Sequence, residues 1–422
     1  MDSKIKVWLV NEGENLPGDD NNPRLQRMGL LAYEVEKLGA KVTWWQSTYN
    51  HYQKSFRCFE DKNVQLTENM ELKMLHSCGY AKNVSVKRLF HEFGTARKFY
   101  KKALEEDKPD VIVVAMPTIA LTHYAVKYAK KFDVPVLIDL RDLNPDVFVS
   151  PFHGIIRTCV SFGIQPLRRM LGNATKAASG LIGTTEPYLN WGLNYAKRVK
   201  NANDRVFFVS YPDGGKATAL SENSRWKEFD GYNGVTCCFF GQFGRLVDFD
   251  TVIEAAAICK KKNIEARFLL CGKGELLEQY QQKVKDMGLD NVYLPGWVNK
   301  TDIADIGFIS DAGLMAYKHD DNFNMQMPNK FSEYLSLGLA ILLQPTGVME
   351  DVIKNNECGL RYETPEQLYE VVKNLSEDKD QLKRMKDNSR KLFEEEFSVS
   401  KVYKEYGEYI IQTANKVKEF KS

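Results

Sequence analysis

The sequence of 422 residues lacks any long hydrophobic run. No window reaches the roughly 18 apolar residues that a membrane-spanning helix needs, and the mean hydropathy is −0.41. The chain begins MDSKIKVWLV, a charged start to a strand, so we expect no signal peptide. With 43% hydrophobic residues, the composition predicts a soluble globular protein.

An excess of one charge is also missing. The 58 basic and 56 acidic residues leave a net charge of +2, which argues against a nucleic-acid partner held by a basic surface. The eight cysteines form no CxxC pair, and the six histidines show no metal-ligand spacing, so we expect no metal site. Cys237, Cys238 and Cys271 lie in apolar runs, which indicates buried thiols in a reducing, cytoplasmic compartment.

Short apolar runs alternate with amphipathic helical stretches along the whole chain. Because several runs are apolar throughout, they predict strands buried on both faces of parallel sheets. The fold class is therefore α/β, with two Rossmann-like domains facing one another across a cleft. The expected strands are 5–10, 41–45, 111–117, 134–140, 180–185, 205–212, 234–241, 266–272, 291–296, 311–317 and 339–345.

A chain of this length exceeds one hydrophobic core, so we expect two domains of about 200 residues. A polar stretch rich in Gly, Asn, Asp and Ser places the boundary near 200–233. We assign 1–205 to an N-terminal domain and 206–397 to a C-terminal domain. The helical pattern 398–422 is expected to pack back on the first domain.

Two segments break the alternation. Residues 151–176 combine apolar positions with Arg157, Arg168, Arg169 and Lys176. Such a helix packs on a domain core or lies on an anionic membrane surface, and the first reading is favoured. Residues 50–95 form a long, polar and aromatic connection, which is typical of a functional segment.

The stretch PNKFSEY contains a candidate anion site. Pro328 suits the start of a helix, where backbone N–H groups of Asn329 and its neighbours are unpaired. Lys330 adds a positive charge, and Glu333 lies one turn further, where its carboxylate can accept hydrogen bonds from a hydroxyl pair. Phosphate plus hydroxyls indicates a nucleotide or a sugar nucleotide; the alternative is an ordinary helix start in a βα repeat.

Three glycine-bearing turns follow strands of the second half, in FFGQFGR, LLCGKGE and LPGWVNK. Glycine lets a ligand approach the backbone closely, and Arg245 with Lys330 supplies charge for a diphosphate. Each turn taken alone is better explained as an ordinary βα turn, and it is the set of turns together with PNKFSEY that favours a ligand site; no GxxxxGK[ST] P-loop is present. The candidate ligand-binding residues in these turns are Gly241, Phe243, Gly244, Gly272, Lys273, Gly274, Trp297 and Val298.

The second half of the chain resembles the donor domain of family-four retaining glycosyltransferases of the GT-B fold. The motifs that carry this resemblance are, in order, FFGQFGR, LLCGKGELLEQY, NVYLPGWV and PNKFSEYLSLGLAIL. Residues 14–57 and 134–146 resemble the subgroup that builds bacterial surface polysaccharides such as O-antigen and capsule. The resemblance implies a nucleotide-sugar donor, a UDP-sugar by preference, no other cofactor, no metal and retention of anomeric configuration. It places Glu333 on the ribose hydroxyls.

The chain departs from the family at three places. Met325 stands where many members carry a first glutamate. The family usually has an arginine and a lysine after the first strand of the donor domain, and this chain has Gln242 and Val247 near those positions. Arg245 is the expected substitute. Arg141-Asp142 replaces a histidine-aspartate pair.

The implied mechanism uses fixed cations and a helix start, in place of a metal, to stabilise the leaving diphosphate. We expect Arg245, Lys330, Arg141 and Asp142 to serve catalysis, although Arg141-Asp142 alternatively forms a local ion pair. The acceptor is expected on the first domain. It is a saccharide, and the resemblance to the subgroup implies a lipid-linked saccharide at the inner face of the cytoplasmic membrane. The candidate acceptor contacts are Asn15, Arg24, His51 and Lys54.

Two other functions fit the same fold. A sugar-nucleotide epimerase would use one cleft without an acceptor, and needs carboxylates for acid–base chemistry at the sugar ring. A non-catalytic sugar-nucleotide-binding homologue would explain the missing first glutamate and the substituted basic residues.

Overall fold

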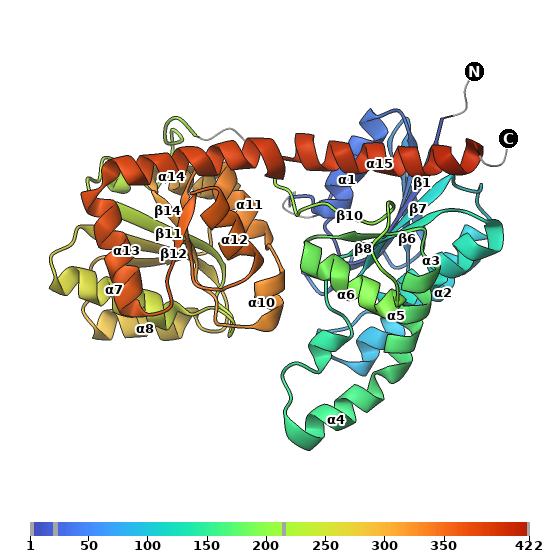
Figure 1. The fold of residues 1–422 in the computed structure, drawn as a ribbon, viewed down its shortest axis with the longest axis horizontal. Coiled ribbons are helices and arrows are strands. Elements are labelled where there is room, and N and C mark those ends of the chain that lie inside the picture. Colours follow the sequence, from blue (N-terminus) through green and yellow to red (C-terminus); the bar gives the residue numbers. More distant parts are fainter. Residues whose placement is uncertain (1–3, 20–23, 213–216, 420–422) are drawn as a thin grey trace. The chain divides into compact units, whose positions relative to one another are not determined.

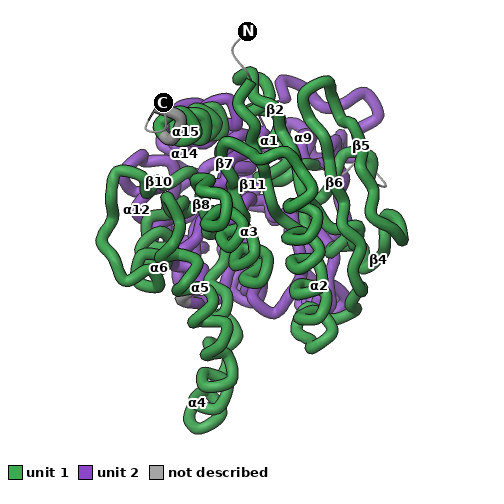
Figure 2. The backbone as a smooth tube through the Cα atoms, turned by 90° about the vertical axis from the view of Figure 1, so that its right-hand side faces the viewer, with its two compact units in different colours: residues 1–208, 402–422 green, residues 209–401 purple. Residues whose placement is uncertain are grey.

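A computed structural model of the protein describes residues 4–19, 24–212 and 217–419. The chain forms two compact units. Unit 1 contains residues 1–208 and 402–422, and unit 2 contains residues 209–401 (Figure 2). Within the described residues, no helix has the length and apolar character needed to cross a bilayer.

Unit 1 is built on an eight-stranded sheet in the order β10-β9-β8-β7-β1-β2-β6-β5 (Figure 1). All neighbours pair in parallel except β5, which runs antiparallel to β6 at the edge. The strands are β1 Lys6–Val10, β2 Lys41–Ser47, β5 Lys62–Thr67, β6 Met70–Leu75, β7 Val111–Met116, β8 Val136–Leu140, β9 Gly180–Gly183 and β10 Arg205–Val206. A two-stranded hairpin, β3 Tyr49–Asn50 and β4 Ser55–Phe56, stands apart from this sheet.

Helices cover both faces of the sheet in unit 1. Trp8 on β1 packs edge-on against Phe99 of α2, with ring centroids 6.3 Å apart. On the next strand, Trp44 of β2 lies against Gly29 of α1. The helices are α1 Arg27–Lys37, α2 Val86–Ala103, α3 Ile119–Phe132, α4 Gly154–Gly163, α5 Gln165–Ala177, α6 Glu186–Ala196 and the greater part of α15 Val399–Glu419; a 3-10 turn, η1, spans Asp146–Phe148.

Unit 2 is built on a six-stranded parallel sheet in the order β13-β12-β11-β14-β15-β16. Its strands are β11 Val235–Gln242, β12 Ala266–Lys273, β13 Val292–Gly296, β14 Ala312–Met315, β15 Ala340–Leu343 and β16 Gly359–Arg361. Its helices are α7 Phe249–Lys261, α8 Leu277–Asp286, α9 Lys300–Ile309, α10 Asp321–Met325, α11 Asn329–Ser336, α12 Val348–Asn355, α13 Pro365–Glu377 and α14 Lys379–Leu392, with a 3-10 turn η2 Lys227–Phe229 and a π-helical turn η3 Phe393–Phe397.

Strand β11 shows why its sequence is apolar throughout. Phe239 packs against Phe249 of α7, with ring centroids 4.8 Å apart. The next residue, Phe240, packs against Tyr334 of α11 at 5.0 Å. Successive side chains of a strand point to opposite faces, so both faces of the sheet are covered by helices. Cys237 and Cys238 are fully buried on the same strand, as the sequence predicts.

The structure corrects three expectations. Residues 205–212 form a strand only at Arg205–Val206, because the chain leaves unit 1 directly afterwards. Residues 50–95 are not a simple connection, since they contain β4, β5, β6 and the start of α2. Residues 151–176 form two helices, which separate at Ile164 just before Pro166 in the first turn of α5.

Candidate functional site

The start of α11 contains a lysine, Lys330, that is buried against aromatic rings. Pro328 is the N-cap residue, and no side chain caps the first turn. Lys330 is 9% exposed, and its Nζ lies 3.2 Å from the centroid of the Phe239 ring. A second ring, of Tyr317, lies 5.2 Å away. The ammonium group is therefore held by aromatic faces at the start of a helix that has no side-chain cap.

Burial lowers the pKa of Lys330 from its usual range to about 7, against the opposing effects of Glu333 and Cys238. Among the described residues, no carboxylate forms a salt bridge with Lys330. A buried cation without such a partner is unfavourable by itself. An anion beside it would stabilise its charged form, which is the property that a diphosphate site needs.

The glycines at the ends of β11 and β12 are required by close packing. A Cβ atom on Gly241 would lie 2.5 Å from Lys330 Nζ, so this turn and the lysine are in direct contact. A Cβ on Gly272 would lie 1.8 Å from the Gly241 carbonyl oxygen, and one on Gly274 would lie 2.4 Å from the Phe243 carbonyl oxygen. These two glycines have φ of +152° and +156°. Packing of the turns therefore accounts for Gly272 and Gly274 without a ligand.

Glu333 already has a protein partner. The Tyr211 hydroxyl donates to Glu333 Oε1 at 2.6 Å, and both residues belong to unit 2. Nearby, the Ser332 hydroxyl donates to the Val209 carbonyl at 2.5 Å. Sequence reasoning missed Tyr211 because it lies in a segment that was expected to be a strand. A polar aromatic residue directly before Pro212 was the one available signal.

The other predicted ligand contacts of unit 2 lie on turns and differ in exposure. The side chain of Arg245 is 85% exposed and pairs with Glu275 at 3.1 Å. Trp297 is 59% exposed, while Val298 is buried. Lys273 and Gly244 are exposed or half-buried in the turns after β12 and β11. Their roles, with those of Asn329 and Phe243, stay predictions.

In unit 1, Arg141 belongs to a buried ion network. Its guanidinium lies 2.7 Å from Asp139 and also bonds Glu14. Asp139 receives a second, bidentate pair from Arg27, at 2.9 and 3.0 Å. Burial favours the neutral acid of Asp139, yet Arg141 and Arg27 hold its pKa below the usual range. The partners of Arg141 are therefore Asp139 and Glu14, not the adjacent Asp142 that the sequence offered as a local partner, and its catalytic role stays a prediction.

Asp142 differs from Arg141 because its carboxylate accepts a hydrogen bond from the adjacent Leu143 N–H at 2.8 Å and forms no salt bridge with the described residues. Burial raises the pKa of Asp142, although the Leu143 N–H and Arg88 oppose the shift. A half-buried carboxyl at the end of β8 can contact a ligand. Its catalytic role stays a prediction.

The predicted acceptor contacts fall into two groups in unit 1. His51 Nδ1 lies 2.6 Å from the Tyr80 hydroxyl, and Lys54 Nζ lies 4.8 Å from the centroid of the same ring. Burial, followed by the charges of Lys54 and Arg88, lowers the pKa of His51 to about 4, so the ring is neutral at pH 7. Asn15 donates to the Arg24 carbonyl at 3.2 Å, which shapes the turn before α1.

An acidic cluster at the end of β1 was not found from the sequence. Glu12 accepts a hydrogen bond from Thr118 at 3.0 Å, and its Oε2 lies 3.8 Å from His91 Nε2. Burial raises the pKa of Glu12 to about 7, and burial with the charge of Glu12 raises that of Glu92 to about 7. Arg88 and Glu92, an i,i+4 pair 2.8 Å apart on α2, were the available signal.

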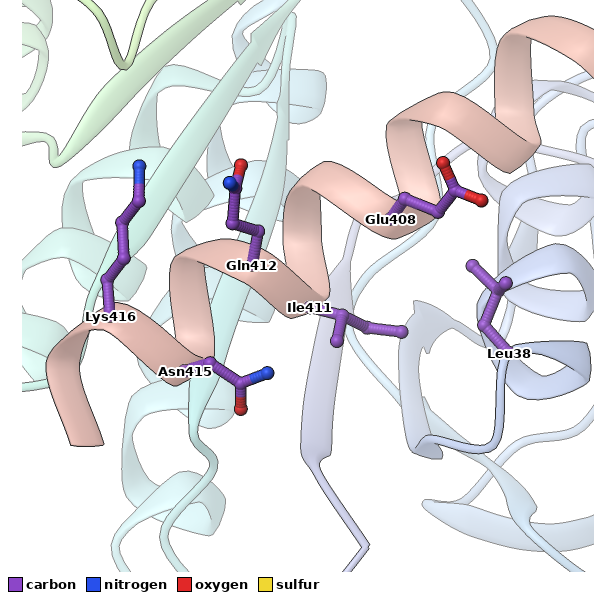
Figure 3. A pocket seen from close by; sticks show the side chains of 6 residues that line it. All are labelled: Leu38, Glu408, Ile411, Gln412, Asn415 and Lys416. Atoms are coloured by element: carbon purple, nitrogen blue, oxygen red, sulfur yellow. The ribbon is translucent and has the colours of Figure 1, made fainter. Parts of the chain in front are cut away.

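A broad hollow of about 540 Å³ lies along α15 in unit 1 (Figure 3). Glu408, Gln412 and Lys416 point to one side of the helix, and Ile411 points toward Leu38. Its polar groups do not converge, so it is not a candidate catalytic site.

The two parallel α/β sheets and their neighbours among solved structures define the GT-B fold. Sucrose-phosphate synthase from Thermosynechococcus elongatus has a TM-score of 0.69 at 13% identity, covering 97% of this chain and 99% of its own. HepE from Anabaena in complex with UDP has a TM-score of 0.65 at 14% identity, covering 97% and 100%. WaaG, a glycosyltransferase involved in lipopolysaccharide biosynthesis, has a TM-score of 0.61 at 15% identity, covering 96% and 99%.

The second unit gives the more specific match. Residues 221–392 match the family described as glycosyl transferases group 1. This stretch contains Lys330, Glu333 and all three glycine-bearing turns. No curated protein matches the sequence.

Proposed function

We propose that the protein is a glycosyltransferase that moves a sugar from a nucleotide sugar, with UDP preferred, to a saccharide acceptor. The family match over 221–392 supports the reaction class. HepE, which shares the fold, has been solved with UDP and with UDP-glucose. The observation that carries the proposal is the buried Lys330 at the uncapped start of α11, in contact with the Gly241 turn.

In the proposed reaction, cleavage of the sugar–diphosphate bond places negative charge on the leaving oxygen. Lys330 and the first N–H groups of α11 stabilise that charge, and no metal is required. The acceptor hydroxyl attacks from the leaving-group face, which retains the anomeric configuration, and the diphosphate takes the proton. The Glu333 carboxylate accepts hydrogen bonds from the ribose hydroxyls, which displace the Tyr211 hydroxyl from Oε1.

A thermal-shift screen with UDP-, GDP- and ADP-sugars tests donor binding, because a ligand that binds only the folded state raises its melting temperature. We expect a UDP-sugar to raise Tm in the wild type and in Lys261→Ala, an exposed lysine at the end of α7. The Lys330→Ala variant should lose the shift. An undiminished shift in Lys330→Ala would overturn the role of this residue.

Product analysis separates the alternatives. A glycosyltransferase releases UDP in proportion to the sugar transferred to a saccharide acceptor. Incubation with UDP-GlcNAc alone that yields a changed sugar, still linked to UDP, would favour an epimerase. Tight UDP binding without any release, across a panel of acceptors, would favour a non-catalytic homologue.

We propose further that the acceptor is lipid-linked and that α4 contacts the inner face of the cytoplasmic membrane. No residue of α4 is buried, and Ile155 and Phe162 are each 81% exposed. Figure 2 shows α4 extending away from the rest of unit 1. We expect Ile155→Ser with Phe162→Ser to reduce flotation with anionic vesicles, and the equally exposed Val199→Ser to leave it unchanged. Equal flotation of all three proteins would contradict the membrane contact.

A further inference from the structure

Unit 1 contains an apolar cavity that the proposed reaction does not use. Its volume of about 340 Å³ falls at the lower end of the range of small-molecule sites, about 300–1,000 Å³. The first turns of α2, the turn between β7 and α3, η1 and the start of α5 form its walls. Apolar side chains dominate the lining, among them Val86, Leu89, Phe93, Ile119, Ile164 and Leu167.

The apolar lining continues onto the surface. Val84 and Val86 line the cavity and are 77% and 68% exposed. Phe90, one turn further along α2 than Val86, is 69% exposed. Soluble proteins rarely expose large apolar side chains in such a group, and a group of this kind marks an interaction site. The cavity therefore opens beside a surface suited to hydrocarbon.

Basic residues outnumber acidic ones around this opening, although Arg88 pairs with Glu92 at 2.8 Å and Arg168 with Asp146 at 2.7 Å. Residues 76–91 contain Lys82, Lys87 and Arg88 but no Asp or Glu. Residues 147–176, which include α4 and nearly all of α5, contain three arginines and Lys176, again without an acid. Basic residues beside exposed apolar side chains favour a surface of anionic lipid. The excess of basic residues thus favours an anionic lipid over an apolar segment of a protein.

Polar groups gather at one end of the lining. Asn144 follows β8, and its side chain donates to the Pro117 carbonyl, which follows β7, at 3.3 Å. Arg88 and Glu92 also line the cavity, and burial together with Glu12 raises the pKa of Glu92. Parallel sheets bind ligands at the carboxyl ends of their strands. A lipid with its chain in the cavity would therefore present its polar head near the carboxyl ends of β7 and β8.

We propose that this cavity binds one hydrocarbon chain of the lipid-linked acceptor, drawn from an anionic membrane beside α4. The inference rests on the proposed function and names the part of the acceptor that unit 1 recognises. A single chain alone gives only marginal membrane attachment, and a second contact is needed for stable binding. The basic, apolar surface of α2 and α4 supplies that second contact.

Calorimetry with dodecyl phosphate, below its critical micelle concentration, tests the cavity directly; inorganic phosphate is the head-group control. The full-length chain should bind dodecyl phosphate and bind inorganic phosphate at least tenfold more weakly. Leu89→Trp and Leu167→Trp place a larger ring at the cavity, and each should weaken dodecyl phosphate binding tenfold or more. Leu104→Trp is the matched control, because Leu104 is 41% exposed at the end of α2 and Leu89 is 40% exposed near its start.

Every variant is also assayed for the UDP-sugar shift in Tm, which reports folding and the donor site. A shift retained in Leu89→Trp shows that the variant folds and that any loss belongs to the cavity. Unchanged dodecyl phosphate binding in both cavity variants, or equal weakening in Leu104→Trp, would overturn the inference. A wild type that responds to UDP-sugar but binds dodecyl phosphate no better than phosphate overturns the inference alone, whereas no response to any sugar nucleotide overturns the proposed function.

Discussion

Unit 1 and unit 2 each bury a cation near the end of a parallel strand, and they treat that cation differently. Arg141 follows β8, and Asp139 and Glu14 neutralise its charge. Lys330 lies against the end of β11 and has aromatic rings and glycine backbone around it. Both are cations that the sequence singles out for catalysis.

The difference lies in what each cation can still bind. Arg141 and Arg27 share the buried Asp139, and Arg27 also lies 5.3 Å from the centroid of the Tyr406 ring of α15. That network joins segments of unit 1 that are distant in sequence, which is a structural role. Burial instead lowers the pKa of Lys330 to about 7, so its charge depends on what lies beside it. An anionic ligand is the partner that this arrangement favours.

The largest expected effect on stability follows from removing Asp139, the carboxylate that pairs with both Arg27 and Arg141. Asp139→Asn leaves Arg27 and Arg141 buried with one carboxylate, Glu14, between them. Removing one partner of a buried ion pair costs about 3–5 kcal/mol of unfolding free energy. Urea denaturation measures the loss. Asp107→Asn, which removes an exposed partner of Lys6, serves as the control and should change little; equal stability of the two variants would refute the structural role of the network.

The next effect concerns Lys330, which forms no salt bridge with the described residues. Lys330→Ala should lower sugar transfer about 100- to 1,000-fold, the usual effect of removing one group that stabilises a developing anion. Its urea midpoint should not fall, because no carboxylate loses its partner. Initial rates of UDP release measure the effect, with Lys261→Ala as the reference. Turnover within threefold of that reference would place the anion site elsewhere.

The lowered pKa of Lys330 also predicts how stability depends on pH. Between pH 7 and about 10 the unfolded lysine is protonated and the folded one is neutral, so the unfolded state binds more protons. Stability without ligand must then rise with pH in this window, by up to about 1.4 kcal/mol per pH unit from this group. Lys330→Met should lack that slope. Parallel stability curves for the wild type and Lys330→Met would contradict the lowered pKa.

The smallest effect is expected at the exposed cation Arg245. Its pair with Glu275 is largely solvated, and such pairs contribute about 0–1 kcal/mol. Arg245→Ala should therefore leave unfolding by urea nearly unchanged and should reduce transfer less than Lys330→Ala does. A loss of transfer equal to that of Lys330→Ala would make Arg245 the principal group on the diphosphate.

The sequence predicts the two sheets well because their strands are apolar throughout. Val111–Met116 is wholly buried, and β11, β12 and β15 lie where apolar runs predict them. In the β3–β6 region, Lys62–Thr67 was missed because it is a partly exposed edge strand with polar residues. A period-based analysis has little signal in such a strand.

The candidate site likewise has features that the sequence predicts and features that it does not. Local pattern predicts the helix start at Pro328 and the turns at Gly241 and Gly272, since these features are set by neighbouring residues. Pairing across the fold is not local: Arg141 meets Glu14 over 127 positions of sequence, and Tyr211 meets Glu333 over 122. Sequence alone therefore names charged residues, whereas the structure distinguishes paired cations from the lysine available to a ligand.

Proton uptake on UDP binding tests the central claim most directly. Calorimetry at pH 8.5, in buffers with different heats of ionisation, counts the protons bound with the ligand. If the diphosphate charges Lys330, the wild type takes up close to one proton per UDP and Lys330→Met takes up none. Tight UDP binding with no proton uptake by the wild type, or with the same uptake by both proteins, would contradict the account.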